Sequence, residues 1–238
     1  MKLKIYFISA LVTIVLFISG SCRVFCTEGN GLVQTEKREL TNCNSFVLDL
    51  PANVRVLKGS ATSVVIEAQE NLLTKIKTHV SGNALKINSD GCISSDEKIL
   101  LTVYLPELEG IAINGSGNIS IPDTFIVQHL KLEINGSGDI NGKFVAAKVK
   151  AEINGSGSIT LSGSADKQDV EILGSGNIQT QSLICNSADI AVKGSGDVYV
   201  YAIKNLDVEV AGSGTVHYKG KPQVNSKVTG SGKVVDEN

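Results

Sequence analysis

The chain has 238 residues, of which 42% are hydrophobic and 19% are charged, and its formal net charge at pH 7 is -2. A nearly neutral chain has no excess of basic residues for nucleic acid or for an anionic membrane surface, so we expect neither to be bound electrostatically. The 24 glycines and the absence of tryptophan indicate many tight turns, as in an all-β domain.

The first 21 residues have the pattern of a secretory signal peptide. Lys2 and Lys4 precede an apolar run from Ile5 to Ile18, and the small residues 19–21 follow it. The run is 14 residues long, whereas a membrane-spanning helix needs about 20. We therefore expect residues 1–21 to be removed on export and residues 22–32 to form a short polar tether.

Cys22 stands directly after this segment. The sequence Ser-Gly-Ser before it resembles a bacterial lipobox, in which the cysteine is lipidated and becomes the mature N-terminus. Ser19 stands where Leu or Val is usual, and the same small residues suit ordinary signal peptidase. The sequence therefore favours a lipid anchor on Cys22 and a bilayer as its partner, with a plain secreted protein as the alternative.

The five cysteines fit an oxidising compartment. If Cys22 is lipidated, four remain, and four cysteines allow three pairings. We favour Cys43 with Cys92, because both precede the regular repeats, and leave Cys26 open. Cys185 lies inside the repeats and is expected to be a free or buried thiol. No C-x-x-C motif occurs and the three histidines are scattered, so we expect no metal site and no cofactor.

Residues 33–110 are rich in β-type sequence but irregular. Residues 71–77 suit either a short helix or the lead into a strand. Three runs are predicted strands: 45–50, 63–68 and 99–105. We interpret this region as irregular N-terminal rungs or a cap continuous with the array that follows, since a solenoid needs protected ends.

Residues 111–238 form one repeated unit, marked by the triplet Gly-Ser-Gly. The seven triplets begin at Gly115, Gly136, Gly155, Gly174, Gly194, Gly212 and Gly230. Their spacing is 18 to 21 residues, and a fixed period of this size is typical of a solenoid.

Apolar β-branched residues flank every triplet. They stand two positions before it and two positions after it, at Ile113, Ile134, Ile153, Ile172, Val192, Val210 and Val228, and at Ile119, Ile140, Ile159, Ile178, Val198, Val216 and Val234. Apolar residues also recur at every second position before the triplets, which predicts strands with one buried face.

Glycine accepts a positive φ at little cost, so each triplet is predicted to be a sharp corner between strands. Stacked corners would place the Ile and Val columns above one another at about 4.8 Å per rung, forming a continuous core. A rung of about 19 residues is too short for a propeller blade, and it lacks the helical period of a leucine-rich repeat. The sequence therefore predicts a right-handed parallel β-helix, or β-solenoid.

Several of these segments together resemble the bacterial head-GIN-domain family, known as the head of autotransporter adhesins. They are residues 54–56, 70–73, 85–87, 103–108 and 113–119, and Ile-Asn-Gly recurs at 113–115, 134–136 and 153–155. The resemblance spans about residues 44–235. It implies an exported β-solenoid with an adhesive or surface role, and it supplies no catalytic residues.

The glycine corners do not match known ligand-binding loops. They lack the third glycine and following helix of a dinucleotide site, and no Gly-Lys-Ser/Thr phosphate loop exists. The residues after the triplets are Asn118, Asp139, Ser158, Asn177, Asp197, Thr215 and Lys233. Only two of them are acidic, which is too few for calcium at every corner. We interpret them as turn formers that can stack as polar ladders.

The outward positions of the repeated strands predict one acidic patch on neighbouring rungs. Its members are Asp169, Glu171, Asp189, Asp207 and Glu209. Carboxylates about 5 Å apart repel one another unless a cation or a basic partner intervenes. The patch is therefore a candidate cation or partner site, and an ordinary solvated face is the alternative.

These features favour a non-catalytic, adhesin-like interaction module of the cell envelope, with an unknown protein or glycan ligand. We expect it in the outer membrane or periplasm or at the cell surface. A periplasmic scaffold or envelope-stress protein is one alternative. A carbohydrate-active β-helix enzyme is another, but the rungs are short and uniform, and no arginine follows Arg55 to hold a sugar.

Overall fold

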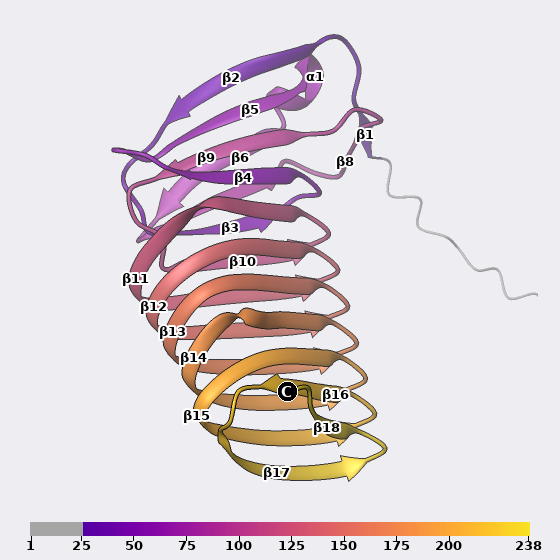
Figure 1. Cartoon of the computed structure of the whole chain (residues 1–238). Helices are drawn as coiled ribbons and strands as arrows, with labels where there is room; N and C mark the ends of the chain where they lie inside the picture. The colour runs from indigo at the N-terminus through magenta and orange to yellow at the C-terminus, as the bar shows by residue number, and fades with distance from the viewer. Residues whose placement is uncertain (1–25) are drawn as a thin grey trace, which may run out of the picture.

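A computed structural model describes residues 26–238, and Figure 1 shows them as one elongated stack of β-strands. The predicted signal peptide and the predicted anchor residue Cys22 lie outside the described residues. Within residues 26–238, no helix is long and apolar enough to cross a membrane.

The repeats form a regular array of parallel coils. Its strands are β10 (Gly110–Gly115), β11 (Asn118–Gly136), β12 (Asp139–Gly155), β13 (Ser158–Gly174), β14 (Asn177–Gly194), β15 (Asp197–Gly212), β16 (Thr215–Lys219), β17 (Gln223–Gly230) and β18 (Lys233–Asp236). Each of β11 to β15 runs round a whole coil, with its bend on the left of Figure 1 and the glycine corner on the right. Parallel in-register pairing joins each coil to the next, which confirms the β-solenoid.

The glycine corners are as the repeat predicted, and backbone contacts explain them. The first glycine of each triplet has a positive φ, for example 143° at Gly136. A Cβ built on Gly136 would overlap the carbonyl oxygen of Gly115 in the coil before. That oxygen accepts a hydrogen bond from the Ser137 amide at 2.9 Å. The corner therefore continues the ladder of backbone hydrogen bonds, and only glycine fits the space.

The interior is filled by the predicted Ile and Val columns. Twelve of the fourteen positions are at most 2% exposed. The two exceptions are Val228 and Val234 on the last coil, where no further coil covers them. Burial of each such side chain stabilises the fold by roughly 1.5–3 kcal/mol. A single coil cannot bury these side chains, so stacking of the coils supplies this stabilisation.

Most strands of the N-terminal region continue the same sheet, but they do not follow chain order, and β1 and β8 form a separate two-stranded sheet. Its elements are β1 (Thr27–Glu28), β2 (Val33–Glu39), β3 (Ser45–Asp49), β4 (Asn53–Lys58), β5 (Ser63–Gln69), α1 (Glu70–Leu73), β6 (Ile76–Ser81), β7 (Ala84–Ser89), β8 (Ile93–Ser94) and β9 (Leu100–Leu105). β3 and β4 lie next to β10 and β11. The later strands β7 and β9 lie beyond them.

Antiparallel strands close this end of the stack. β6 pairs with β7, β5 pairs with β9, and β2 pairs with β5. Residues 71–77 were predicted to form either a short helix or the lead into a strand, and they do both: α1 ends at Leu73 and β6 begins at Ile76. Leu72 of α1 is fully buried. The N-terminal end of the core is therefore covered, whereas all residues of β17 at the other end are exposed.

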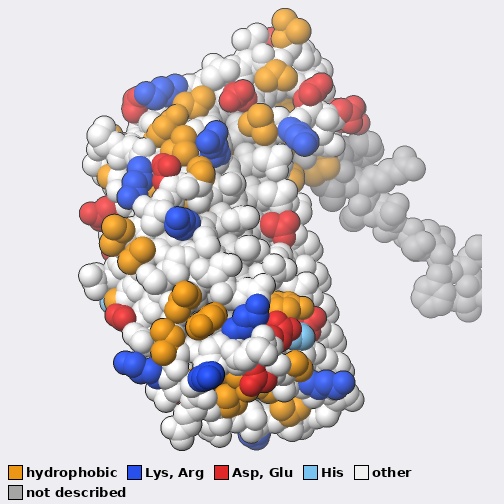
Figure 2. All heavy atoms as spheres, in the orientation of Figure 1, with side chains coloured by type: hydrophobic (Ala, Val, Ile, Leu, Met, Phe, Trp, Pro, Cys, Tyr) orange, Lys and Arg blue, Asp and Glu red, His pale blue; other side chains and the backbone are white. Residues whose placement is uncertain are grey.

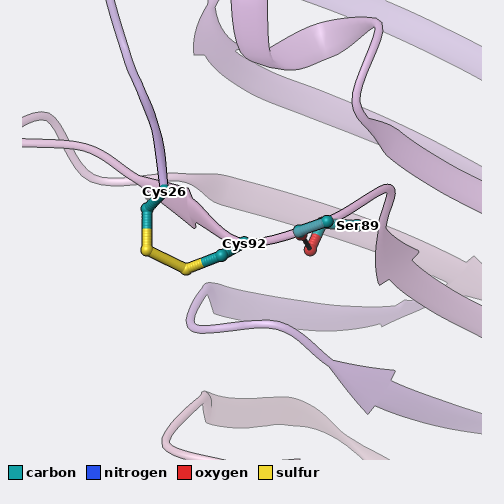
Figure 3. Close-up of a disulfide and its surroundings, with 4 residues drawn as sticks. Cys26, Ser89 and Cys92 are labelled. Atoms are coloured by element: carbon teal, nitrogen blue, oxygen red, sulfur yellow. Dashed lines mark hydrogen bonds between the residues drawn. A yellow bond between two sulfur atoms is a disulfide. The ribbon is translucent and has the colours of Figure 1, made fainter. Parts of the chain in front are cut away.

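The predicted pairing of Cys43 with Cys92 is wrong. Cys92 forms a disulfide with Cys26, and β1 pairs with β8 beside it (Figure 3). Among the described residues Cys43 is free; it is buried in the core just before β3, where its amide donates a hydrogen bond to the Thr62 hydroxyl at 3.2 Å. Cys185 is free and buried, as predicted. In the turn before Cys92, the Ser89 hydroxyl donates a hydrogen bond to the Gly91 carbonyl at 2.7 Å.

Candidate interaction surfaces

The structure places the five predicted acidic residues side by side on the outer face of β13, β14 and β15. Asp169, Asp189 and Asp207 follow one another in a single column across the three strands. Glu171 and Glu209 stand in the next column, with Ala191 between them. We call these five residues the acidic face.

Lysines balance most of this negative charge. The sequence analysis did not predict these lysine partners, because it considered only the outward positions of each single strand. Ion pairs join Lys148 to Asp169 at 2.5 Å, Lys167 to Asp189 at 2.5 Å, Lys193 to Glu171 at 3.0 Å and Lys227 to Glu209 at 3.0 Å. Most of these lysines stand in neighbouring columns. Among the described residues, Asp207 is the one member of the acidic face that forms no ion pair; it accepts a hydrogen bond from Asn225 at 3.1 Å.

The ion pairs favour the charged forms of their partners. The hydrogen bond from Lys227 lowers the pKa of Glu209 below its ordinary value. The hydrogen bond to Asp189, with the charge of Asp169, raises the pKa of Lys167. These groups therefore stay ionised at neutral pH, and most of the repulsion expected within the acidic face is removed.

A groove of about 420 Å³ crosses the acidic face. It exists because Ala191 interrupts a column of longer side chains that includes Glu152, Glu171 and Glu209. Ala191 lies at its floor together with Val170, Ile190 and Val208, which are only 3–5% exposed because their side chains face the core. The groove thus combines an apolar floor with a charged rim, a common arrangement for small ligand sites.

The Asn residues of the Ile-Asn-Gly motif form a ladder that the sequence analysis did not identify. Asn154 donates to Asn135 at 2.9 Å, and Asn135 donates to Asn114 at 3.1 Å. Asn114 donates in turn to the carboxylate of Asp49, which also pairs with Lys86 at 2.8 Å. The ladder links the array to the N-terminal coils. The recurrence of Asn at the same place in three units was the signal for it.

The pKa of Asp49 reflects two opposed effects. Partial burial raises it, but the hydrogen bonds from Lys86 and Asn114 outweigh burial, so the pKa lies below its ordinary value. The ladder therefore ends on an ionised acceptor, and hydrogen bonds to a charged group are stronger than those between neutral groups.

Side chains after the triplets join neighbouring corners. The Asp197 amide donates to the side chain of Asn177 at 3.2 Å, and the Thr215 amide donates to the Asp197 carboxylate at 2.9 Å. These contacts support their interpretation as turn formers.

Within residues 26–238, no group of three or more His, Cys, Asp or Glu side chains is placed to hold a metal ion.

A second surface, which the sequence analysis did not identify, runs along the bends. Ile126, Val145, Ile184 and Ile203 are all exposed there and line one groove of about 490 Å³. We call these four residues the aliphatic stripe. Hydrophobic side chains reach the surface at the left margin of Figure 2, where the bends of the upper coils lie. Aligning the chain on the Gly-Ser-Gly triplets does not align these four residues with one another, because the strand pairing shifts within several bends.

The chain matches a known protein family. A family model described as "Putative auto-transporter adhesin, head GIN domain" matches residues 45–222. No curated protein sequence matches the chain.

Several crystal structures share the fold. A protein described as a putative adhesin from Bacteroides fragilis has a TM-score of 0.83 at 23% identity, covering 88% of this chain and 99% of its own. One described as a putative lipid binding protein from Parabacteroides distasonis has a TM-score of 0.76 at 22% identity, covering 90% and 100%. One described as a putative adhesin from Parabacteroides merdae has a TM-score of 0.71 at 21% identity, covering 89% and 99%. At these identities the likeness shows the fold.

Proposed function

The chain belongs to the head GIN domain family, and from that premise we propose that it is a non-catalytic, adhesin-like interaction module of the cell envelope. The family is described as the head of an auto-transporter adhesin. The partner we propose is a protein or glycan that binds the groove of the acidic face. The supporting observation is the gap at Ala191, which leaves a groove with an apolar floor inside a charged rim.

The charge state of the acidic face supports binding rather than glycoside hydrolysis. A glycosidase needs one carboxylic acid whose pKa is raised, so that it can donate a proton near neutral pH. Here the pKa of Glu209 is lowered by Lys227, and lysines hold three of the other four carboxylates. Asp207 lacks such a lysine and remains available to a basic or hydroxyl group of a partner.

A single substitution tests the groove. Ala191→Glu would restore the column of long side chains and fill the groove. We expect it to weaken binding to immobilised glycans or to cell surfaces by about tenfold or more, the effect of losing about 1.4 kcal/mol. Ala112→Glu is the matched control, because Ala112 stands in the same column but outside the groove. Equal binding by the two variants would contradict the proposal.

Export and anchoring are parts of the same proposal. We propose that the protein is exported and held by lipid on Cys22, so that the solenoid stands at the cell envelope. Palmitate labelling of the full chain and of Cys22→Ser tests the anchor: label should enter the first and not the second. An unmodified Cys22 in the mature protein would contradict it.

Protease treatment of whole cells distinguishes the two sides of the envelope. An adhesin should be cleaved by added protease while periplasmic control proteins remain intact. Protection of the solenoid would favour the alternative, a periplasmic scaffold that binds other envelope proteins on the same faces.

A further inference from the structure

The two ends of the stack differ in how they are closed. Antiparallel strands of the chain itself cover the N-terminal end of the core. At the opposite end, lowest in Figure 1, the last strands are β17 and β18, and all eight residues of β17 are exposed. Within residues 26–238, no strand pairs with the outer edge of either one. A row of backbone amide and carbonyl groups there can therefore accept a further strand.

This open end also leaves part of the core uncovered. Val224 and Val228 are 38% and 41% exposed, although they continue the buried columns of Leu206 and Val210. Between them Ser226 points inward as well, because side chains alternate along a strand. Edge strands that avoid pairing often carry an inward charge or a proline. The inward positions of β17 carry neither, so its edge is open to another strand.

We propose that the open end is an interface with a second copy of the same chain, joined end to end. Each coil has two walls, the strand segment before the glycine corner and the segment after it. The two-fold axis runs along the strands and lies in the plane of the contact, so it inverts the second copy and exchanges the two walls. β17 ends at the corner and β18 begins there. β17 of one copy therefore lies antiparallel to β18 of the other, on both sides of the contact.

The axis also fixes the register of the new strand pairs. The corners of the two copies lie on the same side, so residues equally far from Ser231, the centre of the last triplet, come to lie opposite one another. Val228 and Val234 are each three residues from Ser231, so Val228 of one copy meets Val234 of the other. These are the two column positions that the array leaves uncovered. The apolar columns of one copy thus continue into those of the other.

The polar side chains match in the same register. Ser226, a hydroxyl donor, lies opposite the carboxylate of Asp236. On the outer side, the amide of Asn225 lies opposite the carboxylate of Glu237. No like charges meet in the opposite pairs from Asn225 to Thr229, whereas like charges placed directly opposite destabilise an antiparallel pair. The open end is therefore complementary to itself in polar as well as apolar positions.

The position of the open end gives the pairing a role, which rests on the proposed function. β1, where the described chain begins, lies near the covered end of the stack (Figure 1). A lipid on Cys22 would hold the molecule by that end, so the open end would point away from the membrane. Two copies joined at their open ends carry their anchors at opposite ends of the pair. The further partner we infer is thus a second copy on another cell, which makes the adhesion homophilic.

The contact is small, because it involves one coil of each copy. The eight residues of β17 span only about 26 Å at about 3.3 Å per residue. A contact of this size makes a single pair weak. Many copies on two facing surfaces act together and bind far more tightly than one pair, so the pairing is best measured between surfaces.

Clustering of coated beads tests the pairing. The protein purified after export carries Cys22→Ser, which prevents lipidation, and a biotin tag directly after residue 22. It coats streptavidin beads of two colours at equal density, and we expect mixed clusters because the open ends point outward. Beads coated through a biotin tag after Asn238 should cluster at least about tenfold less, because their open ends face the bead and multivalent contact is lost.

A single substitution tests whether the open end makes the contact. Val228→Lys places a charge against Val234 of the other copy and should reduce clustering by about tenfold or more. Because Val228 is already 41% exposed, the variant should fold, which circular dichroism checks. Leu173→Lys is the matched control: Leu173 is 40% exposed but lies away from the last coil, and its beads should cluster like wild type. Equal clustering by Val228→Lys or by C-terminally coupled beads, or no mixed clusters at all, would overturn the interface.

Cysteine cross-linking of the clustered beads tests the register. Thr229→Cys on one colour and Lys233→Cys on the other should form a disulfide with copper phenanthroline, because these positions lie opposite one another. Thr229→Cys on both colours should link poorly, since its two copies lie on opposite walls; linking as strong as that of the mixed pair would overturn the two-fold axis. These assays contain no glycan and no lipid on Cys22. Their failure would therefore leave the groove and the anchor as proposed, and failure of those proposals would leave the clustering unchanged.

Discussion

The two turns of each coil follow different rules. At the glycine corner, every unit has the same three residues and the same backbone geometry. At the bend, the buried column changes from Phe125 and Phe144 to Gly163 and then to Leu183. Every corner is fixed because backbone atoms of adjacent coils touch there. At the bend a contact of this kind occurs at Gly163, where a Cβ would overlap the Phe144 carbonyl oxygen, whereas Phe and Leu side chains occupy the same position in neighbouring coils. The corners therefore specify the fold, and the bends and faces are free to carry binding surfaces.

The largest expected effect is at the corner itself. Gly136→Ala adds a methyl group that overlaps the Gly115 carbonyl and also has an unfavourable φ. We expect a loss of about 3 kcal/mol or more in the free energy of unfolding, from strain and overpacking together. Urea unfolding followed by circular dichroism measures it.

Gly115→Ala is the control that separates the two causes. Its φ is 118°, but a Cβ there would meet no atom within 4 Å, because Gly115 begins the column. We expect a loss of only about 1–2 kcal/mol from backbone strain. Equal losses at Gly115 and Gly136 would show that stacking contact does not fix the corner.

A substitution just after a bend should stabilise the protein. Gln168 is fully buried in a column otherwise made of Leu130, Val149, Ala188 and Leu206. Within residues 26–238, neither polar atom of its side chain has a hydrogen-bond partner. Gln168→Leu removes that unsatisfied amide, and we expect a gain of about 1–3 kcal/mol. Thermal unfolding compares it with wild type; a lower melting temperature would show that the amide has a partner in solution.

The Asn ladder beside the corners should matter less than the glycines. Asn135→Ala removes hydrogen bonds to Asn114, Asn154 and Glu133 at exposed or partly buried positions, and we expect a loss of about 1 kcal/mol. Later units have Leu173 and Lys193 at this position, so the fold tolerates the change there. A loss of stability as large as that of Gly136→Ala would show that the Asn ladder specifies the fold as strongly as the glycines do.

The smallest expected effect is the pH dependence from Asp49. Its folded pKa lies below the ordinary value of 3.8. The stabilisation is therefore complete above the unfolded pKa and is lost as the pH falls through the folded pKa. Because the group is partly exposed, we expect less than about 1 kcal/mol. Unfolding of wild type and Asp49→Asn between pH 5 and pH 2.5 measures the difference; identical pH profiles would contradict the assignment.

The sequence predicted the array because each unit carries its own register. Aligning the triplets placed the Ile and Val columns correctly, and the two positions that are not fully buried, Val228 and Val234, lie on the last coil. The N-terminal region has no such repeat. There β3 pairs with β10, although 65 residues separate Ser45 from Gly110, and only the closed structure brings them together. Because this region has no repeat to align, the sequence analysis paired Cys92 with Cys43 instead of Cys26.

The candidate surfaces were only partly predictable. The acidic face was found because its members occupy two outward positions of the aligned units. Its lysine partners were missed, because Lys148 and Lys193 come from neighbouring columns. The aliphatic stripe was missed because the bends differ in length. Between Thr180 and Ile184 the pairing with β15 shifts, so counting from the triplets misaligns Ile184 and Ile203.

Hydrogen exchange resolved to single amides tests the difference between corners and bends most directly. The Ser137, Ser156 and Ser175 amides donate to the glycine of the preceding coil, each at 2.9 Å. We expect these corner amides to exchange as slowly as those of the strand cores, and residues 181–183 in the bend of β14 to exchange at least about tenfold faster. Corner amides that exchange faster than the bends would contradict the view that the glycine corners specify the fold.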